Sequence, residues 1–377
     1  MKEKMDRRKF IQYMGTGVIL LGSMPLISNA EGIAGKDFEI RGKGKKMIPG
    51  LSKDEFDILY LASLAPSGHN AQPWTVTVLE PGHWIIGSAK NRWLPAVDPE
   101  NRELFLSIGA FMENLIIAAG ARGYEVETEI PAQRPENTEI LNIRLTKREP
   151  LEYPLQRITT RRTVRNNYLN KDIKDADIRY LEGSGAEHVS YYPRESREGK
   201  YLREGTIEAN RIQAYRDSAQ VELSDWIRWS DKDAEKYRTG LTPESMEING
   251  FAGWFVRHFF DRKSVLKKSF REKTIKTVVD QVKTSGGWLA ITSKDSSIPS
   301  LIEAGRKFER IFLTARERMI AIHPMTQMLE ELPMKNEAAR ELGVNGNIQF
   351  LLRIGYLESY PDPVSLRMPV SWFVKAI

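Results

Sequence analysis

Apolar and polar residues alternate along the chain with two periods, one typical of helices and one typical of strands. The helical period first appears after Ser52, which has the spacing of a capping box with Glu55. The apolar face of this first helix comprises Phe56, Leu59, Tyr60 and Leu64. The helix is expected to end at Pro66–Gly68. Two longer helices are predicted, one from about Arg102 to Arg122 and one from a second capping box at Ser300–Glu303.

Short runs that are rich in β-branched residues, or that alternate with a period of two, predict strands between these helices. They are Trp74–Leu79, His83–Gly87, Ile140–Leu145, Trp288–Lys294 and Ile348–Tyr356. Strands and helices in this order indicate an α+β fold, in which a mixed sheet is packed with helices.

The later long helix repeats the earlier one at a constant offset of 196 residues (305 − 109). Gly305 matches Gly109, and Glu309 matches Glu113. A strand precedes each helix and another follows it. Amphipathicity alone explains the apolar matches, so two unrelated helices are the alternative. We favour a duplication, in which two related halves form an intramolecular pseudo-dimer.

The first 30 residues have the features of an export signal. Arg7 and Arg8 precede an apolar stretch from Met14 to Ile27, and Ser28–Ala30 supplies a small-residue cleavage site. The arginine pair resembles a twin-arginine signal. We therefore expect the protein to use the twin-arginine export machinery and to lie in the periplasm or on the outer face of the cytoplasmic membrane. A basic tail with a chance apolar run, and an uncleaved anchor, are the alternatives.

The chain has 377 residues, which is more than one core usually organises. The predicted divisions are an export signal at 1–30, a linker at 31–50, a first half at 51–150, and a second half at 151–377 with an insertion or lid near 195–285. The formal net charge is +6 and is partly due to the N-terminal segment, so nucleic acid is not an expected partner. The chain has no cysteine, and its five histidines lack the spacing of a helical zinc pair, so we expect no metal.

The segment APSGHNAQPW, at residues 65–74, carries the strongest chemical signal. A helix ends there, Gly68 frees the backbone, and the amides of Asn70 and Gln72 offer both donors and acceptors. Such groups suit a heteroaromatic ring edge on which carbonyls and nitrogens alternate. An ordinary connection between a helix and a strand is the alternative.

A second polar cluster is RRTVR at residues 161–165. Several guanidinium groups and a hydroxyl at this spacing can bind a phosphate through paired hydrogen bonds. Arg367, close to the C-terminus, is a candidate for closing the same site. A solvated basic turn is the alternative.

Together these motifs resemble the nitroreductase superfamily. APSGHNAQPW matches the flavin-contacting loop of that family, and RRTVR matches its phosphate-binding segment. In ordinary members the arginine segment comes first, and the site is completed across a homodimer interface. Here the loop lies in the first half and the arginine segment in the second, so the chain resembles the fused Acg-like branch and keeps one complete site. The resemblance covers roughly residues 50–180 and 285–370.

The resemblance implies a nitroreductase-like fold and an oxidoreductase that depends on FMN. By this resemblance, the flavin ring and ribityl chain would contact Pro66, Ser67, Gly68, Asn70 and Gln72. The phosphate would be held by Arg161, Arg162, Thr163, Arg165 and Arg367. Ser107 and Gly109 are further candidates for the cofactor site. Because the flavin carries the chemistry, no catalytic residue is nominated.

A small-molecule electron donor would reduce the FMN, and an acceptor such as a nitroaromatic compound or a quinone would reoxidise it. NAD(P)H is not expected outside the cytoplasmic membrane, so flavin storage or sequestration with little turnover is the alternative. The insertion is rich in aromatic and basic residues. It is interpreted as a lid over the flavin, a surface that touches anionic lipid, or a solvated helix packed through its apolar face. A monomer and a further dimer both remain open.

Overall fold

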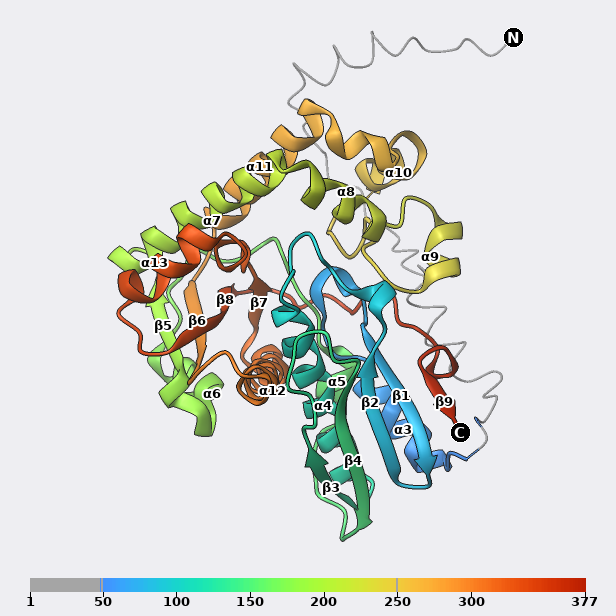
Figure 1. Cartoon of the computed structure of the whole chain (residues 1–377). Helices are drawn as coiled ribbons and strands as arrows, with labels where there is room; N and C mark the ends of the chain where they lie inside the picture. The colour runs from blue at the N-terminus through green and yellow to red at the C-terminus, as the bar shows by residue number, and fades with distance from the viewer. Residues whose placement is uncertain (1–47, 49, 249) are drawn as a thin grey trace, which may run out of the picture.

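The computed structural model describes residues 48, 50–248 and 250–377. The predicted export signal and almost all of the predicted linker lie outside the described residues. The described chain forms two sheets with helices between and above them, which confirms the predicted α+β class (Figure 1).

The first sheet has five strands in the order β3-β4-β2-β1-β9. All neighbours pair antiparallel except β9, which lies parallel to β1, so the sheet is mixed. The strands are β1 (Trp74–Glu80), β2 (His83–Ser88), β3 (Tyr124–Glu129), β4 (Glu139–Lys147) and β9 (Val374–Ala376). Because β9 ends the chain, the last residues of the predicted second half complete the sheet of the first.

The second sheet has four antiparallel strands in the order β5-β6-β8-β7. They are β5 (Val189–Pro193), β6 (Gly287–Ser293), β7 (Ile320–Pro324) and β8 (Asn347–Tyr356). Helices cover both faces, so β6 is buried along its whole length. Successive side chains of β6 point to opposite faces of the sheet. Leu289 packs in the main hydrophobic core, and Trp288 packs in a second hydrophobic cluster that includes residues of the insertion.

Three helices form the centre of the molecule: α3 (Lys53–Ala62), α4 (Arg102–Ala121) and α12 (Ile298–Ala315). The capping box predicted for α3 is confirmed, since Ser52 and Glu55 exchange both hydrogen bonds. The capping box predicted at Ser300–Glu303 is wrong. The N-cap of α12 is Ser297, because Pro299 fits the first turn and Ser300 therefore lies inside the helix.

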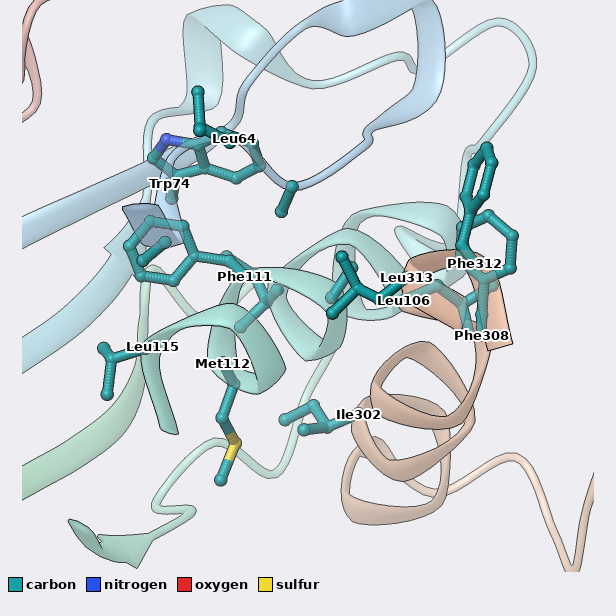
Figure 2. Packing of buried hydrophobic residues seen from close by; sticks show 14 of the residues in the cluster. Leu64, Trp74, Leu106, Phe111, Met112, Leu115, Ile302, Phe308, Phe312 and Leu313 are labelled. Atoms are coloured by element: carbon teal, nitrogen blue, oxygen red, sulfur yellow. The ribbon is translucent and has the colours of Figure 1, made fainter. Parts of the chain in front are cut away.

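The two long helices α4 and α12 pack directly against each other between the sheets. Figure 2 shows Phe111 of α4 beside Trp74, and Ile302 of α12 beside α4; the rings of Phe111 and Trp74 have centroids 5.1 Å apart. At the crossing, a Cβ atom on Gly109 would lie 2.1 Å from a carbonyl oxygen of α12. Among the described residues α4 alone is long and apolar enough to cross a membrane, and 83% of its apolar window is buried in this core.

The remaining helices lie around this centre. They are α5 (Gln156–Thr160), α6 (Asp175–Glu182), α7 (Arg197–Tyr215), α8 (Asp217–Trp226), α9 (Asp231–Tyr237), α10 (Gly250–Phe259), α11 (Lys268–Val282) and α13 (Leu332–Leu342). In Figure 1, α7 and α11 lie side by side along the second sheet, and α8, α9 and α10 continue above the first. The basic helix α11 buries Val278 and Val282, which confirms that it packs through an apolar face.

Candidate active site

The loop that follows α3 has a strained backbone. His69, Asn70 and Gln72 have φ angles of 50°, 53° and 51°, in a left-handed region that residues other than glycine seldom adopt. Ser67 supports the turn, because its Oγ accepts a hydrogen bond from the backbone N–H of Gln72 at 2.9 Å. Such strain persists only where the surroundings fix it, and it clusters at functional sites.

Asn70 ties this loop to two distant segments. Its Nδ2 donates to the carbonyl oxygens of Gly240 and Leu366 at 3.0 and 3.1 Å. Its Oδ1 accepts from Arg367, whose Nη2 also donates to the carbonyl of Leu64 at 2.9 Å. The side chains of Asn70 and Arg367 are therefore bound to each other and to the main chain.

Gln72 has the same role and is fully buried. Its Nε2 donates to the carbonyl of Arg238 at 2.9 Å, and its Oε1 accepts from the backbone N–H of Met368 at 2.9 Å. The two amides thus join the loop to residues 238–240 of the insertion and to residues 366–368 near the C-terminus.

Arg161 lies in a buried cluster behind the loop. Its Nη2 donates to the carbonyl of Leu64 at 2.9 Å, and its Nε lies 3.4 Å from the carboxylate of Glu309. The guanidinium lies 4.9 Å from the ring centre of Phe312. Burial raises the pKa of Glu309 to about 7, and the charge of Arg161 opposes that shift.

The rest of the RRTVR segment faces in two directions. Arg162 donates to the carbonyl of Asp362 and lies 3.5 Å from Glu247. The backbone N–H of Arg165 donates to the same Glu247 at 3.1 Å. The Nη1 of Arg165 donates to the carbonyl of Ser245 at 2.5 Å, and both Thr163 and Arg165 line a cavity.

This cavity has a volume of about 330 Å³ and lies between the loop, the two long helices and the insertion. Its apolar wall consists of Leu106, Ala110, Phe308 and Phe350. Its wall from the insertion consists of Asn210 and Gln213 on α7, Ala219, Gln220 and Leu223 on α8, and Thr274 on α11. The insertion therefore covers one side of the cavity.

One end of the cavity is acidic. Glu103 of α4 and Glu330 both line it. Burial raises the pKa of Glu330 to about 8, and the charge of Glu103 adds to the shift. Burial also raises the pKa of Asp98, which precedes α4, to about 6. In the loop, burial lowers the pKa of His69 and the charge of Glu103 opposes it.

A second group of residues that line the cavity is basic. It comprises Arg165 and His323, and the charge of Arg353 acts on His323 from β8. Burial lowers the pKa of His323 well below its ordinary value, and the charges of Arg353 and Arg165 lower it further. His323 is therefore neutral at pH 7, and the positive charge beside it comes from the two arginines.

Four buried polar atoms of the cavity wall have no hydrogen-bond partner among the described residues. They are Asn210 Oδ1, Gln220 Oε1, Gln327 Oε1 and His323 Nδ1. An unpaired buried polar atom is unfavourable by about 1–3 kcal/mol. All four belong to residues that line the cavity, although the atoms themselves have almost no accessible surface.

The structure divides the twelve residues predicted for the cofactor site into two groups. Those that line the cavity are Pro66, Ser67, Gly68, Ser107, Thr163 and Arg165. Those that lie behind its wall are Asn70, Gln72, Arg161, Arg162 and Arg367, with Gly109 at the helix crossing. The second group holds the loop and the arginine segment in place.

Sequence reasoning missed the residues that the insertion and the second sheet bring to the cavity. Asn210 and Gln213 on α7, with His323 and Glu330, are the main examples. A signal was present on α7, where Thr206, Asn210 and Gln213 share one helical face. Polar residues on a helix face that is otherwise buried mark a site rather than a core.

No family model matches the chain. Over 317 residues it is 24% identical to "Putative NAD(P)H nitroreductase Rv3131" of Mycobacterium tuberculosis, covering 81% of this chain and 86% of the relative. Over 324 residues it is 23% identical to "Probable NAD(P)H nitroreductase PigM" of a Serratia species, covering 78% of this chain and 86% of the relative. The chain is thus similar over most of its length to proteins named as NAD(P)H nitroreductases.

Two solved structures are also similar to parts of the chain. One is a nitroreductase-like family protein from Bacillus cereus, at 14% identity and a TM-score of 0.33, covering 61% of this chain and 99% of that one. The other is the FMN-dependent nitroreductase NfnB from Mycobacterium smegmatis in complex with NADPH, at 12% identity and a TM-score of 0.33, covering 55% and 93%.

Proposed function

We propose that the protein is an FMN-dependent oxidoreductase of the nitroreductase type, with its flavin in the cavity between the loop and the insertion. The observation that carries this proposal is the cavity itself, which is lined by the loop, by the acidic residues Glu103 and Glu330, and by the basic residue Arg165. The loop APSGHNAQPW forms one of its sides. The names of the curated relatives support the same class of enzyme.

The residues of the cavity fit a flavin mononucleotide. A volume of about 330 Å³ lies within the range of small-ligand pockets. Thr163 and Arg165, which line the cavity, would hold the phosphate by charge-assisted hydrogen bonds. The loop at Ser67 and Gly68 would lie against the ring edge.

In this proposal the protein positions the cofactor and excludes water. A bound flavin supplies hydride transfer from a reduced donor to an oxidised acceptor. The apolar residues Leu106, Phe308 and Phe350 limit the access of water from the side of the two long helices. Asn70 and Gln72 fix the loop from behind, because their amides are bound to main-chain groups.

Flavin sequestration is the second candidate function, and one observation favours it. The insertion lines one side of the cavity and is bound to the loop through Gly240 and Arg238, so it is held in place over that side. A cover of this kind would retain a flavin and slow its reaction with a donor or an acceptor.

An anaerobic half-reaction experiment distinguishes the two functions. The purified protein with its flavin is mixed with NADH, NADPH or a reduced viologen dye, and the flavin absorbance is followed. After reduction, a quinone or a nitroaromatic compound is added. An oxidoreductase is reduced and reoxidised within seconds and turns over repeatedly. A flavin that is bound tightly but exchanges electrons only over hours supports sequestration.

We further propose that the chain is exported through the twin-arginine machinery and acts outside the cytoplasm. The support is the Arg7–Arg8 pair with the apolar stretch behind it. Replacing both arginines by lysine should retain the protein in the cytoplasm, as cell fractionation would show. Export of the lysine variant, or retention of the unchanged protein, would contradict this. Contact of the basic helix α11 with anionic lipid stays a prediction.

We also propose that the two halves form an intramolecular pseudo-dimer. The support is the reciprocal contact at the helix crossing. A Cβ atom on Gly109 would meet the carbonyl of Ile302, and one on Gly305 would meet that of Leu106, both at 2.1 Å. Both pairs obey the offset of 196 residues, since 305 − 109 and 302 − 106 are equal.

A further inference from the structure

Two carboxyl groups at the acidic end of the cavity share one hydroxyl group. The Oγ1 of Thr326 lies 3.3 Å from Glu103 Oε1 and 3.3 Å from Glu330 Oε1. Arg102 Nη2 donates to the same oxygen of Glu103 at 3.1 Å. Gln213 Nε2 donates to the other oxygen of Glu330 at 2.7 Å.

The single hydrogen of the Thr326 hydroxyl determines the direction of the hydrogen bonds among Glu103, Thr326 and Glu330. A threonine hydroxyl carries one hydrogen, so it donates to only one of the two carboxyl groups. Glu103 is ion-paired with Arg102 and can only accept, so Thr326 donates to Glu103. The remaining contact is then a hydrogen bond only if Glu330 is protonated and donates to Thr326.

The charges around Glu330 agree with this arrangement. Burial raises the pKa of its carboxyl to about 8, the charge of Glu103 raises it further, and that of Arg102 opposes the shift. Asp98, before α4, and Glu222, on α8, are further acidic groups near Glu103. On the same side, His69 is a loop imidazole whose pKa is lowered by burial.

We propose that Glu330 delivers a proton to the electron acceptor, and that the acceptor is an uncharged molecule, such as a quinone, whose oxygen takes up that proton. This inference rests on the proposed function. An ionised Glu103 beside the site disfavours acceptors that carry a negative charge. Thr326 and Glu103 are positioning residues, because they act through Glu330.

The step balances in atoms and charge. A quinone that receives a hydride at one oxygen gains two electrons and one proton, and it becomes a hydroquinone when a second proton reaches its other oxygen. That proton leaves the carboxyl of Glu330, whose O–H bond breaks as the new O–H bond forms. The carboxylate then regains a proton from water. General acid catalysis of this kind contributes roughly 10²- to 10⁴-fold in rate.

The first test measures the proton itself. Infrared spectra of the purified protein are recorded between pH 6 and pH 10 for the unchanged chain, for Glu330→Gln, and for Glu337→Gln, whose glutamate is exposed on α13. Glu309, whose pKa is about 7, should contribute a protonated carboxyl band in all three proteins. The unchanged protein and Glu337→Gln should show a further protonated carboxyl that disappears near pH 8, and Glu330→Gln should lack that contribution. Identical spectra for the unchanged protein and Glu330→Gln would overturn the proposal.

The second test measures the acceptor step. Glu330→Gln should bind flavin in full, lose about 100-fold in kcat/KM for a neutral quinone, and lose the fall in rate above pH 8. Thr326→Val provides a second variant if Glu330→Gln does not fold, and it should shift both the infrared band and the pH profile. An unchanged pH profile in either folded variant would contradict the assignment.

The two proposals fail in different ways. If the purified protein binds no flavin, the proposed function fails, and the infrared titration still reports whether Glu330 holds a proton. If flavin is bound and reacts with acceptors at the same rate in Glu330→Gln, only the role of Glu330 fails. Faster reaction with an anionic quinone than with a neutral one would overturn the assignment of the acceptor class.

Discussion

Gly109 and Gly305 occupy equivalent positions where α4 and α12 cross, and each faces a carbonyl of the other helix. A Cβ atom on either glycine would lie 2.1 Å from that oxygen, which is closer than a carbon atom can approach. The two backbones can therefore meet only because both residues lack a side chain. This contact sets the distance between the halves, and with it the width of the cavity that both helices line.

Alanine at either glycine should force the long helices apart. We expect Gly305→Ala and Gly109→Ala each to lower the free energy of unfolding by about 2 kcal/mol or more, because overpacking exceeds the gain in helix propensity. Gly120→Ala is the matched control in α4, since the nearest atom belongs to the exposed side chain of Leu151. Chemical denaturation measures all three. Equal stability of Gly305→Ala and Gly120→Ala would contradict the tight crossing.

Breaking the buried ion pair of Arg161 and Glu309 should lower the free energy of unfolding substantially. Arg161→Leu leaves the Glu309 carboxylate without its charged partner in a site with no solvent exposure, so we expect a loss of about 3–5 kcal/mol at pH 8. The loss should be smaller at pH 5, because Glu309 is then neutral. Arg157→Leu removes a more exposed ion pair with Glu317 and should change stability by about 1 kcal/mol or less.

The buried ion pair is tested by comparing the stability loss of Arg161→Leu with that of Arg157→Leu. Denaturation curves at pH 5 and pH 8 give both values for each variant. If Arg161→Leu and Arg157→Leu destabilise the protein equally at pH 8, the buried cluster does not have the assigned charges.

Glu330 should make stability fall as the pH rises. Its folded pKa, about 8, lies above the ordinary glutamate value, so folding favours the protonated form. The contribution is fully present below the ordinary value and is lost as the pH rises through about 8, with a total of roughly 5 kcal/mol. Glu330→Gln should make this decline shallower between pH 5 and pH 9, and Glu337→Gln should not, while the part of the decline due to Glu309 persists in both variants. An equally steep decline in Glu330→Gln and the unchanged protein would contradict the burial of an ionisable proton at Glu330.

Gln72 should control how firmly the insertion is held. Gln72→Ala leaves the carbonyl of Arg238 and the N–H of Met368 without their partner, so we expect a loss of about 2 kcal/mol. It should also speed proteolysis within residues 195–285, measured by mass spectrometry of the fragments. Gln133→Ala, at an exposed position, is the control.

Flavin should oppose that proteolysis if the insertion is a lid. Added FMN is expected to slow cleavage of the unchanged protein within residues 195–285. Equal cleavage with and without FMN would remove the lid interpretation, even if the stability of Gln72→Ala falls as expected.

Much of the fold could be predicted because its signals are local. The strand at Trp74 and the helix after Arg102 follow from alternation and from an apolar face, and both lie within two residues of their predicted ends. Strand β9 could not be predicted, because three residues gain their structure only by pairing with a strand some 300 residues earlier. The start of α12 was misplaced because two serines were available as caps.

The candidate site could be predicted only in part, for a similar reason. The loop at Ser67–Gly68 and the pair Thr163 and Arg165 were identified from their own sequence and do line the cavity. The partners of Asn70 and Gln72 are main-chain groups more than 160 residues away, which no local pattern specifies. Glu330 could not be identified from the sequence, because its raised pKa results from burial beside Glu103 in the folded protein.

The flavin content of the purified protein shows most directly whether the cavity holds one flavin per chain. The protein is isolated without added flavin, its visible spectrum is recorded, and the released cofactor is identified by mass spectrometry. We expect a yellow protein with one FMN per chain. Arg165→Met should lose the FMN and Arg157→Met should keep it, since of these two arginines only Arg165 lines the cavity. A colourless protein that takes up no FMN when it is added would show that the cavity is not a flavin site.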